Sequence, residues 1–120
     1  MRGHAEVARR VRGAEQVVLS TVVIGELLFG FRLGARLRKN TQELDAFLDN
    51  PYVAAAPVTR TTADRFARIA AALRVKGRPI PTNDIWVAAH AMETGAELLS
   101  FDSHFAEVDG LAWTSPSVQS

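Results

Sequence analysis

Three acidic residues in distinctive apolar frames are the side chains best suited to chemistry. Glu26 lies in TVVIGELLFG, Asp84 in PTNDIWVAA and Asp102 in LLSFDSHF. Carboxylates that meet at the edge of a core repel one another, by about 4 kcal/mol per pair at 4 Å with an effective dielectric near 20. A proton or a cation between them removes that repulsion. The three frames therefore predict a site for a hard divalent metal.

Composition limits what else the chain can be. It has 120 residues, of which 48% are apolar and 22% are charged, and this predicts one domain over residues 1–120 with a single core. The sequence contains no cysteine, which excludes a disulfide framework, a thiolate nucleophile and a Cys-based zinc site. Any metal must therefore be bound by oxygen or imidazole.

Charge and hydropathy indicate the compartment and the partners. Fourteen basic and thirteen acidic residues give a net charge of +1, so no overall nucleic-acid footprint is present and contacts with a polyanion must be local. The start, Met1–Glu6, lacks the apolar core of a signal peptide, and no stretch approaches the roughly 20 apolar residues of a membrane span. We expect a soluble cytoplasmic protein that does not bind a membrane.

The elements that must position the acids follow from hydrophobic spacing and from capping residues. We predict helices over residues 6–12, 21–34, 37–48, 61–77 and 82–95, and strands over residues 16–19, 52–58, 96–101 and 111–113. Strands that alternate with helices predict an α/β sandwich around a mostly parallel sheet.

These elements place each acid at a boundary. Glu26 falls beside the buried face of its helix, and Asp84 falls in the first turn of its helix, where backbone dipoles favour an ionised carboxylate. Asp102 follows the strand 96–101, and ligands of parallel sheets bind beyond the carboxyl ends of the strands. Taken singly, each acid also has a simpler interpretation, as an exposed helix charge, a helix-capping acid or a turn residue.

The order and spacing of these acids resemble the PIN-domain nucleases, and the wording of the frames resembles the VapC toxins of toxin–antitoxin pairs. The resemblance spans nearly the whole chain. Its most specific part runs from Pro81 to Phe105 and includes Asn83-Asp84, Trp86, Ala88-Ala89, Gly95, Leu98-Leu99, Asp102 and His104-Phe105.

The resemblance implies a ribonuclease site in a PIN-like α/β/α sandwich. Glu26, Asp84 and Asp102 would be the catalytic residues and the ligands of Mg²⁺ or Mn²⁺, whose bound water attacks a phosphodiester. Ser100 resembles a hydroxyl position that orients the carboxylates, and His104 is either such a supporting group, a general acid or a turn residue. The implied partners are an RNA substrate, a small VapB-like antitoxin and a second copy of the chain.

The sequence departs from the family at its beginning. PIN domains open with a central strand that ends in a fourth acid, and a helix follows it, whereas Met1–His4 already resembles the loop after that helix. Either the start codon lies further upstream or the gene is truncated. Buried unpaired strand amides cost about 1–3 kcal/mol each, so we expect an unstable chain with weak metal binding and slow cleavage until an upstream strand ending in Asp is restored.

Several other residues keep two interpretations. His90 is a surface or packed residue, while Trp86 and Phe105 are core residues whose rings can also stack RNA bases. Glu93 and Glu107, like Asp45 and Asp49, are interpreted as surface charges. The basic segment is a solvated face, an RNA phosphate track or the contact for an acidic partner, and it comprises Arg32, Arg36, Arg38 and Lys39.

Two other classes of function stay open. One is a remnant that binds an antitoxin but cleaves nothing, and the other is a PIN nuclease of RNA processing or DNA flaps without an antitoxin. We predict an apolar partner surface on the helices between Leu28 and Leu48, with Leu37 and Phe47 as candidates.

Overall fold

The computed structural model describes residues 9–10, 13 and 16–116. Of the helix predicted over residues 6–12, Arg9 and Arg10 belong to this part, and both are helical. The chain divides into two compact units, which are described separately: the α2–α3 unit, Glu15–Pro57, and the α4–α5 unit, Met1–Ala14 with Val58–Ser120. The prediction of one domain is not tested by this division.

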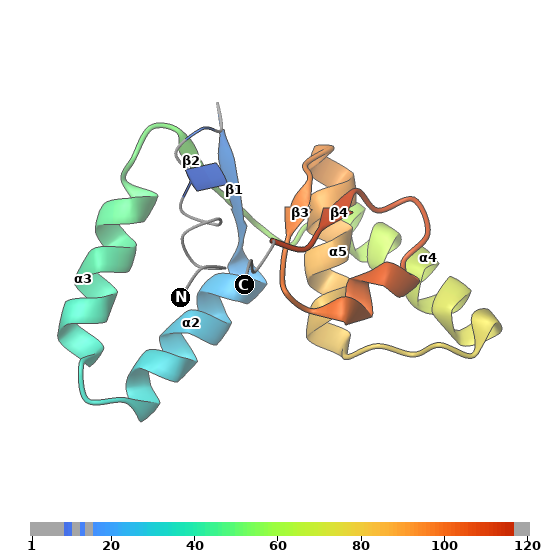
Figure 1. Ribbon diagram of the computed structural model, residues 1–120, viewed down its shortest axis with the longest axis horizontal. Coiled ribbons are helices and arrows are strands. Elements are labelled where there is room, and N and C mark those ends of the chain that lie inside the picture. Colours follow the sequence, from blue (N-terminus) through green and yellow to red (C-terminus); the bar gives the residue numbers. More distant parts are fainter. Residues whose placement is uncertain (1–8, 11–12, 14–15, 117–120) are drawn as a thin grey trace. The chain divides into compact units, whose positions relative to one another are not determined.

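The α2–α3 unit consists of β1 (Val17–Ser20), α2 (Thr21–Leu33), α3 (Leu37–Leu48) and β2 (Val53–Ala56). The two strands pair in parallel, with Val17 opposite Val53 and Ser20 opposite Ala56 (Figure 1). The Ser20 side chain caps α2 by accepting a hydrogen bond from the Val22 amide. None of the residues of α2, all of which the structure describes, is buried.

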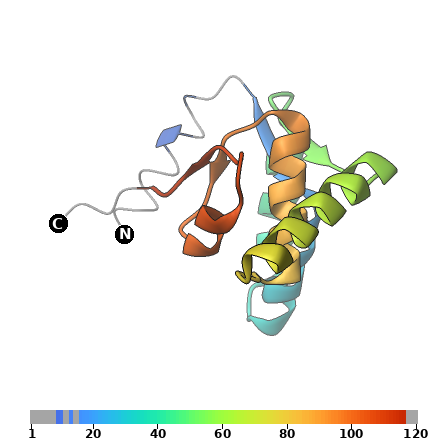
Figure 2. The same ribbon diagram turned by 90° about the vertical axis from the view of Figure 1, so that its right-hand side faces the viewer.

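The α4–α5 unit contains the larger core. Its helices α4 (Arg60–Lys76) and α5 (Thr82–Thr94) pack side by side (Figure 2), and β3 (Leu98–Leu99), the 3-10 helix η1 (Ser103–Glu107) and β4 (Trp113–Thr114) follow. The buried cluster combines residues from α4, from α5 and from the segment around η1: Ile69, Leu73, Ile85, Ala88, Ala89, Phe105 and Val108. This packing fixes the start of α5 and the turn after β3 in one rigid neighbourhood.

A buried hydrogen bond joins α4 to α5 and corrects one expectation. Thr62 is fully buried and donates from its hydroxyl to Glu93 Oε1 at 2.7 Å. Glu93 is therefore a half-buried acceptor, not an ordinary surface charge. The sequence does not reveal this bond because it joins residues 31 positions apart.

The mixed α/β class with parallel strand pairing is confirmed, although β2, β3 and β4 are shorter than predicted. In the described part of the chain they form two parallel pairs, β1 with β2 and β3 with β4. The strand predicted over residues 96–101 spans two residues, because Ser100 and Asp102 already form a side-chain-bonded turn. Among the described residues no helix is long and apolar enough to cross a membrane.

Candidate metal centre

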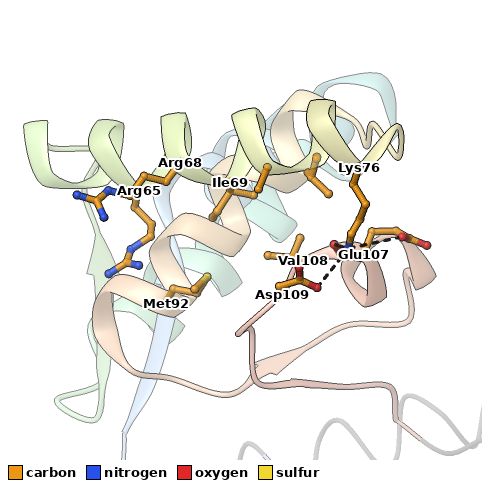
Figure 3. Close-up of a pocket in the computed structure, with 10 residues that line it drawn as sticks. Arg65, Arg68, Ile69, Lys76, Met92, Glu107, Val108 and Asp109 are labelled. Atoms are coloured by element: carbon orange, nitrogen blue, oxygen red, sulfur yellow. Dashed lines mark hydrogen bonds and ion pairs between the residues drawn. The ribbon is translucent and has the colours of Figure 1, made fainter.

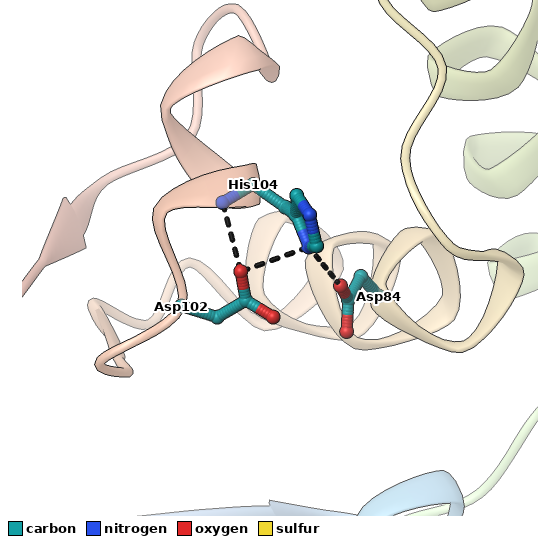
Figure 4. Close-up of side chains that lie close together, drawn as sticks. All are labelled: Asp84, Asp102 and His104. Atoms are coloured by element: carbon teal, nitrogen blue, oxygen red, sulfur yellow. Dashed lines mark hydrogen bonds and ion pairs between the residues drawn. The ribbon is translucent and has the colours of Figure 1, made fainter.

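Two carboxylates and an imidazole converge where α5 begins and where the turn after β3 enters η1. His104 Nδ1 lies 3.2 Å from Asp84 Oδ2 and 2.9 Å from Asp102 Oδ1 (Figure 4). One possible ligand atom from each of the three residues lies within 4.8 Å of the other two. The structure therefore brings Asp84 and Asp102 together and adds His104 to them.

Asp84 is held by the first turn of α5. Its amide donates to the Pro81 carbonyl at 3.0 Å, and the next residue, Ile85, anchors the turn in the core. The Asp84 side chain is 19% exposed. Burial raises the pKa of Asp84 above its ordinary value, with a hydrogen bond from His104 acting in the opposite direction and the charge of Asp102 adding to the rise.

Asp102 is oriented by its own turn. It is the N-cap of η1, and its Oδ1 accepts a hydrogen bond from the His104 amide at 2.9 Å. This backbone hydrogen bond is the main reason why the pKa of Asp102 lies below its ordinary value. The capping role fits the simpler interpretation of Asp102, yet the same oxygen also faces the His104 ring.

Ser100 supports Asp102 through the main chain. Its hydroxyl accepts a hydrogen bond from the Asp102 amide at 3.1 Å. Ser100 is itself fixed to β4, because its amide donates to the Thr114 carbonyl and its carbonyl accepts from Trp113 Nε1. The Ser100 hydroxyl, which was expected to orient the carboxylates, therefore contacts the backbone amide of Asp102 and not a carboxylate oxygen.

His104 is the residue whose role the sequence leaves undecided. Its side chain is 49% exposed, whereas the adjacent Phe105 is buried in the core and anchors the turn. The hydrogen bond with Asp84 is the largest of the causes that raise the pKa of His104. Its spacing from Asp102 is a visible signal in the sequence, but its contact with Asp84 joins residues 20 positions apart.

Glu26 belongs to the α2–α3 unit. It lies on α2 and is exposed within a helix that has no buried residue, so it does not border a buried face as the sequence suggests. Its meeting with Asp84 and Asp102 stays a prediction.

The donor set fits a divalent cation. The carboxylates of Asp84 and Asp102 both lie close to His104 Nδ1 and repel each other. A positive charge between them, carried by a proton on Nδ1 or by a metal ion, offsets that repulsion. Mg²⁺ is commonly bound by one or two carboxylates together with water and substrate phosphates. Asp84 and Asp102 would supply those oxygens.

The other singled-out side chains have structural roles. His90 is 2% exposed and Phe105 is in the core, so the packed interpretation of each is confirmed. Trp86 is half-buried, and its ring stacks on Phe66 with the centroids 4.1 Å apart.

A separate hollow lies between α4 and the segment after η1 (Figure 3). Its apolar lining includes Ile69, Met92 and Val108, and it shares no residue with the Asp84–Asp102–His104 group. At its rim Lys76 Nζ donates to the Glu107 carbonyl at 2.6 Å and to Asp109 Oδ1 at 3.2 Å. These bonds tie the end of η1, and with it the turn that carries His104, to α4.

Known proteins resemble this chain in sequence and in fold. Ribonuclease VapC5 of Mycobacterium tuberculosis is 29% identical over 98 residues, which are 82% of this chain and 73% of that protein. VapBC-1 from nontypeable Haemophilus influenzae superposes with a TM-score of 0.80 at 23% identity, covering 92% of this chain and 84% of that one. DNA-bound VapBC from Salmonella typhimurium gives a TM-score of 0.82 at 18% identity, covering 93% and 85%.

The two structures show a shared fold, and the match to a family model shows the family. The PIN domain model matches residues 2–111, nearly the whole chain. The resemblance inferred from the acidic motifs is thereby confirmed, and the chain belongs to the PIN domain family.

Proposed function

We propose that this protein is a VapC-like, metal-dependent endoribonuclease toxin. The convergence of Asp84 and Asp102 on one point is the observation that carries the proposal, because a phosphodiesterase that works through a metal needs carboxylates at such a point. The similarity to a protein named as a ribonuclease supports the same reaction class.

The proposed roles follow from the chemistry of the side chains. Asp84 and Asp102 bind Mg²⁺ or Mn²⁺, and Glu26 supplies a third carboxylate from α2. The bound ion supplies a polarised water and neutralises charge on the phosphate. The hydrogen bonds that Asp102 receives and donates within its turn hold its carboxylate in place, so little reorganisation is required when substrate binds.

We also propose a small antitoxin as partner, since the structural neighbours include VapBC complexes. We place its binding site on α2 and α3, which leave the apolar side chains of Leu27, Phe29, Leu33, Leu37 and Phe47 exposed. Exposed apolar side chains in such a group are typical of protein interaction sites. The sequence candidates Leu37 and Phe47 are both partly exposed there.

A second copy of the chain and the RNA complete the proposed set of partners. Arg32, Arg36, Arg38 and Lys39 are all exposed in the same unit, where they fit RNA phosphates or an acidic segment of the antitoxin. A homodimer is the oligomeric state that the family resemblance implies. Light scattering with and without the antitoxin measures that state directly.

RNA digestion with and without a chelator tests the enzymatic proposal. We expect slow cleavage that requires Mg²⁺ or Mn²⁺ and that is lost in Asp84→Asn and Asp102→Asn. Asp45→Asn is the matched control, because Asp45 is an exposed aspartate of α3. Cleavage that the chelator does not reduce and that persists in both variants would contradict the metal mechanism. Antitoxin binding without any cleavage would instead support the inactive remnant.

A further inference from the structure

We infer that His104 Nδ1 binds the same cation as Asp84 and Asp102, which makes the centre a mixed carboxylate–imidazole site that prefers Mn²⁺ to Mg²⁺. The inference rests on the proposed function, because it concerns the ion of that site. It goes further in assigning a nitrogen ligand to a site that the sequence resemblance describes through carboxylates alone.

The spacing of the donor atoms is the first argument. Neighbouring ligands of an octahedral ion with bonds of about 2.0–2.1 Å lie about 2.9 Å from each other. His104 Nδ1 lies 2.9 Å from Asp102 Oδ1 and 3.2 Å from Asp84 Oδ2. These separations match those of adjacent corners of one coordination shell.

The way in which the turn holds the ring is the second argument. The His104 amide donates to Asp102 Oδ1, and the buried Phe105 ring fixes the next residue in the core. One short turn thus carries both the imidazole and the Asp102 carboxylate. Their relative position depends on local bonds, so a cation meets two ligands that are already arranged.

The choice of ion follows from the ligand type. Oxygen ligands and water suit Mg²⁺, whereas an imidazole favours transition-metal ions. When the ion displaces the proton from Nδ1, the imidazole keeps its other proton on Nε2 and gives the Nδ1 lone pair to the ion. Mn²⁺ binds both carboxylate and imidazole ligands. Its bond to the His104 nitrogen is therefore stronger than the corresponding bond of Mg²⁺.

Spin-echo spectroscopy of the full chain loaded with Mn²⁺ tests this assignment. A directly bound imidazole nitrogen modulates the electron spin echo of Mn²⁺. We expect this nitrogen signal in the wild type and its loss in His104→Asn, whose amide occupies nearly the position of Nδ1. The His104 backbone amide is unchanged in this variant, so Asp102 keeps its hydrogen bond. His104→Gln serves as a second variant if the first is poorly folded by circular dichroism.

A matched control addresses the other histidines of the chain. The sequence has three, and His90 is buried, so His4→Gln is the control for a competing imidazole. The nitrogen signal should persist in this variant. In parallel titrations we expect His104→Asn to weaken Mn²⁺ binding by about tenfold or more and Mg²⁺ binding by less.

The outcomes separate this inference from the proposed function. Mn²⁺ that binds without nitrogen modulation, or a signal that persists in both His104 variants, overturns the assignment and leaves the metal nuclease intact. Mn²⁺ binding that is unchanged in Asp84→Asn and Asp102→Asn overturns both. An equal loss of affinity for the two metals contradicts the stated preference for Mn²⁺.

Discussion

Helices α2 and α5 have the same length, thirteen residues each, and opposite environments. No residue of α2, which the structure describes in full, is buried, whereas α5 has five buried residues, Ile85, Ala88, Ala89, His90 and Ala91. Nevertheless α2 is the more apolar helix in sequence. Apolar composition alone therefore does not determine which helix becomes core.

The difference also separates the two predicted acids that these helices carry. Asp84 begins a helix packed into the core, so its position is fixed by neighbours that the structure describes, while Glu26 lies on a helix whose apolar residues lack such cover. An apolar helix of this kind is expected to be covered by a partner. The comparison thus supports the two proposed roles, catalytic positioning by α5 and partner binding by α2.

The largest expected effect concerns the acid on each helix. Asp84→Asn should reduce metal-dependent RNA cleavage by at least about a hundredfold, because a bound metal contributes several kcal/mol to the transition state and about 1.4 kcal/mol corresponds to a factor of ten. Glu26→Gln should also reduce it if α2 supplies a ligand. Single-turnover rates measure both. A wild-type rate in Glu26→Gln would restrict the site to the α4–α5 unit.

The second prediction compares stability. Ile85→Ala should destabilise the protein by about 2–5 kcal/mol, since the Ile85 side chain is buried in the core of the α4–α5 unit. Leu33→Ala, on the exposed end of α2, should change the free energy of unfolding by less than about 0.5 kcal/mol. Urea unfolding of both variants, monitored by circular dichroism, gives the two values. Similar losses would show that α2 is buried in the folded protein.

The third prediction concerns partner binding. Phe29→Ala and Leu33→Ala remove side chains that are 67% and 74% exposed, so they should each weaken antitoxin binding by about 1–3 kcal/mol without loss of stability. Val75→Ala on α4 is the control, because Val75 is even more exposed and belongs to the other unit. Calorimetric titration measures the affinities. Equal effects of all three substitutions would contradict a specific α2 surface.

The smallest expected effect is a titration. In the metal-free protein the pKa of His104 should lie above its ordinary value of 6.5, and Asp84→Asn should lower it, because the hydrogen bond with Asp84 is the largest cause of the rise. Protonation of His104 therefore stabilises the folded chain at acidic pH, and this contribution disappears as the pH rises through the folded-state pKa. NMR of the imidazole resonances follows both pKa values, with Asp64→Asn as the control.

The helices could be predicted from sequence because their signals are local. Gly77 and Gly95 end α4 and α5 with φ of 71° and 70°, the left-handed conformation that favours glycine, and both ends were predicted at these residues. The start of α4 was placed too late. Thr59, Thr61 and Thr62 all have capping side chains, and the capping box uses Thr59 with Thr62.

The candidate site could be predicted in part. The frames of Asp84 and Asp102 suggested their meeting, since a first-turn acid and an acid after a strand reach the same edge of a parallel α/β fold. The roles of His104 and Glu93 cannot be predicted from the sequence. The contact of His104 with Asp84 and that of Glu93 with Thr62 each join residues far apart in the chain. The exposure of α2 was missed for another reason, namely that periodicity identifies an apolar face but not what covers it.

The stack of Trp86 on Phe66 and the bond from Trp113 Nε1 to Ser100 have an optical consequence. Both tryptophans of the chain belong to the α4–α5 unit, while the single tyrosine, Tyr52, belongs to the α2–α3 unit. Emission excited at the red edge of the indole band therefore reports on one unit, whereas far-ultraviolet dichroism reports on both. Melting curves that coincide by the two signals would identify one cooperative transition, and curves that separate would show that the α2–α3 unit unfolds without a change in the tryptophan emission.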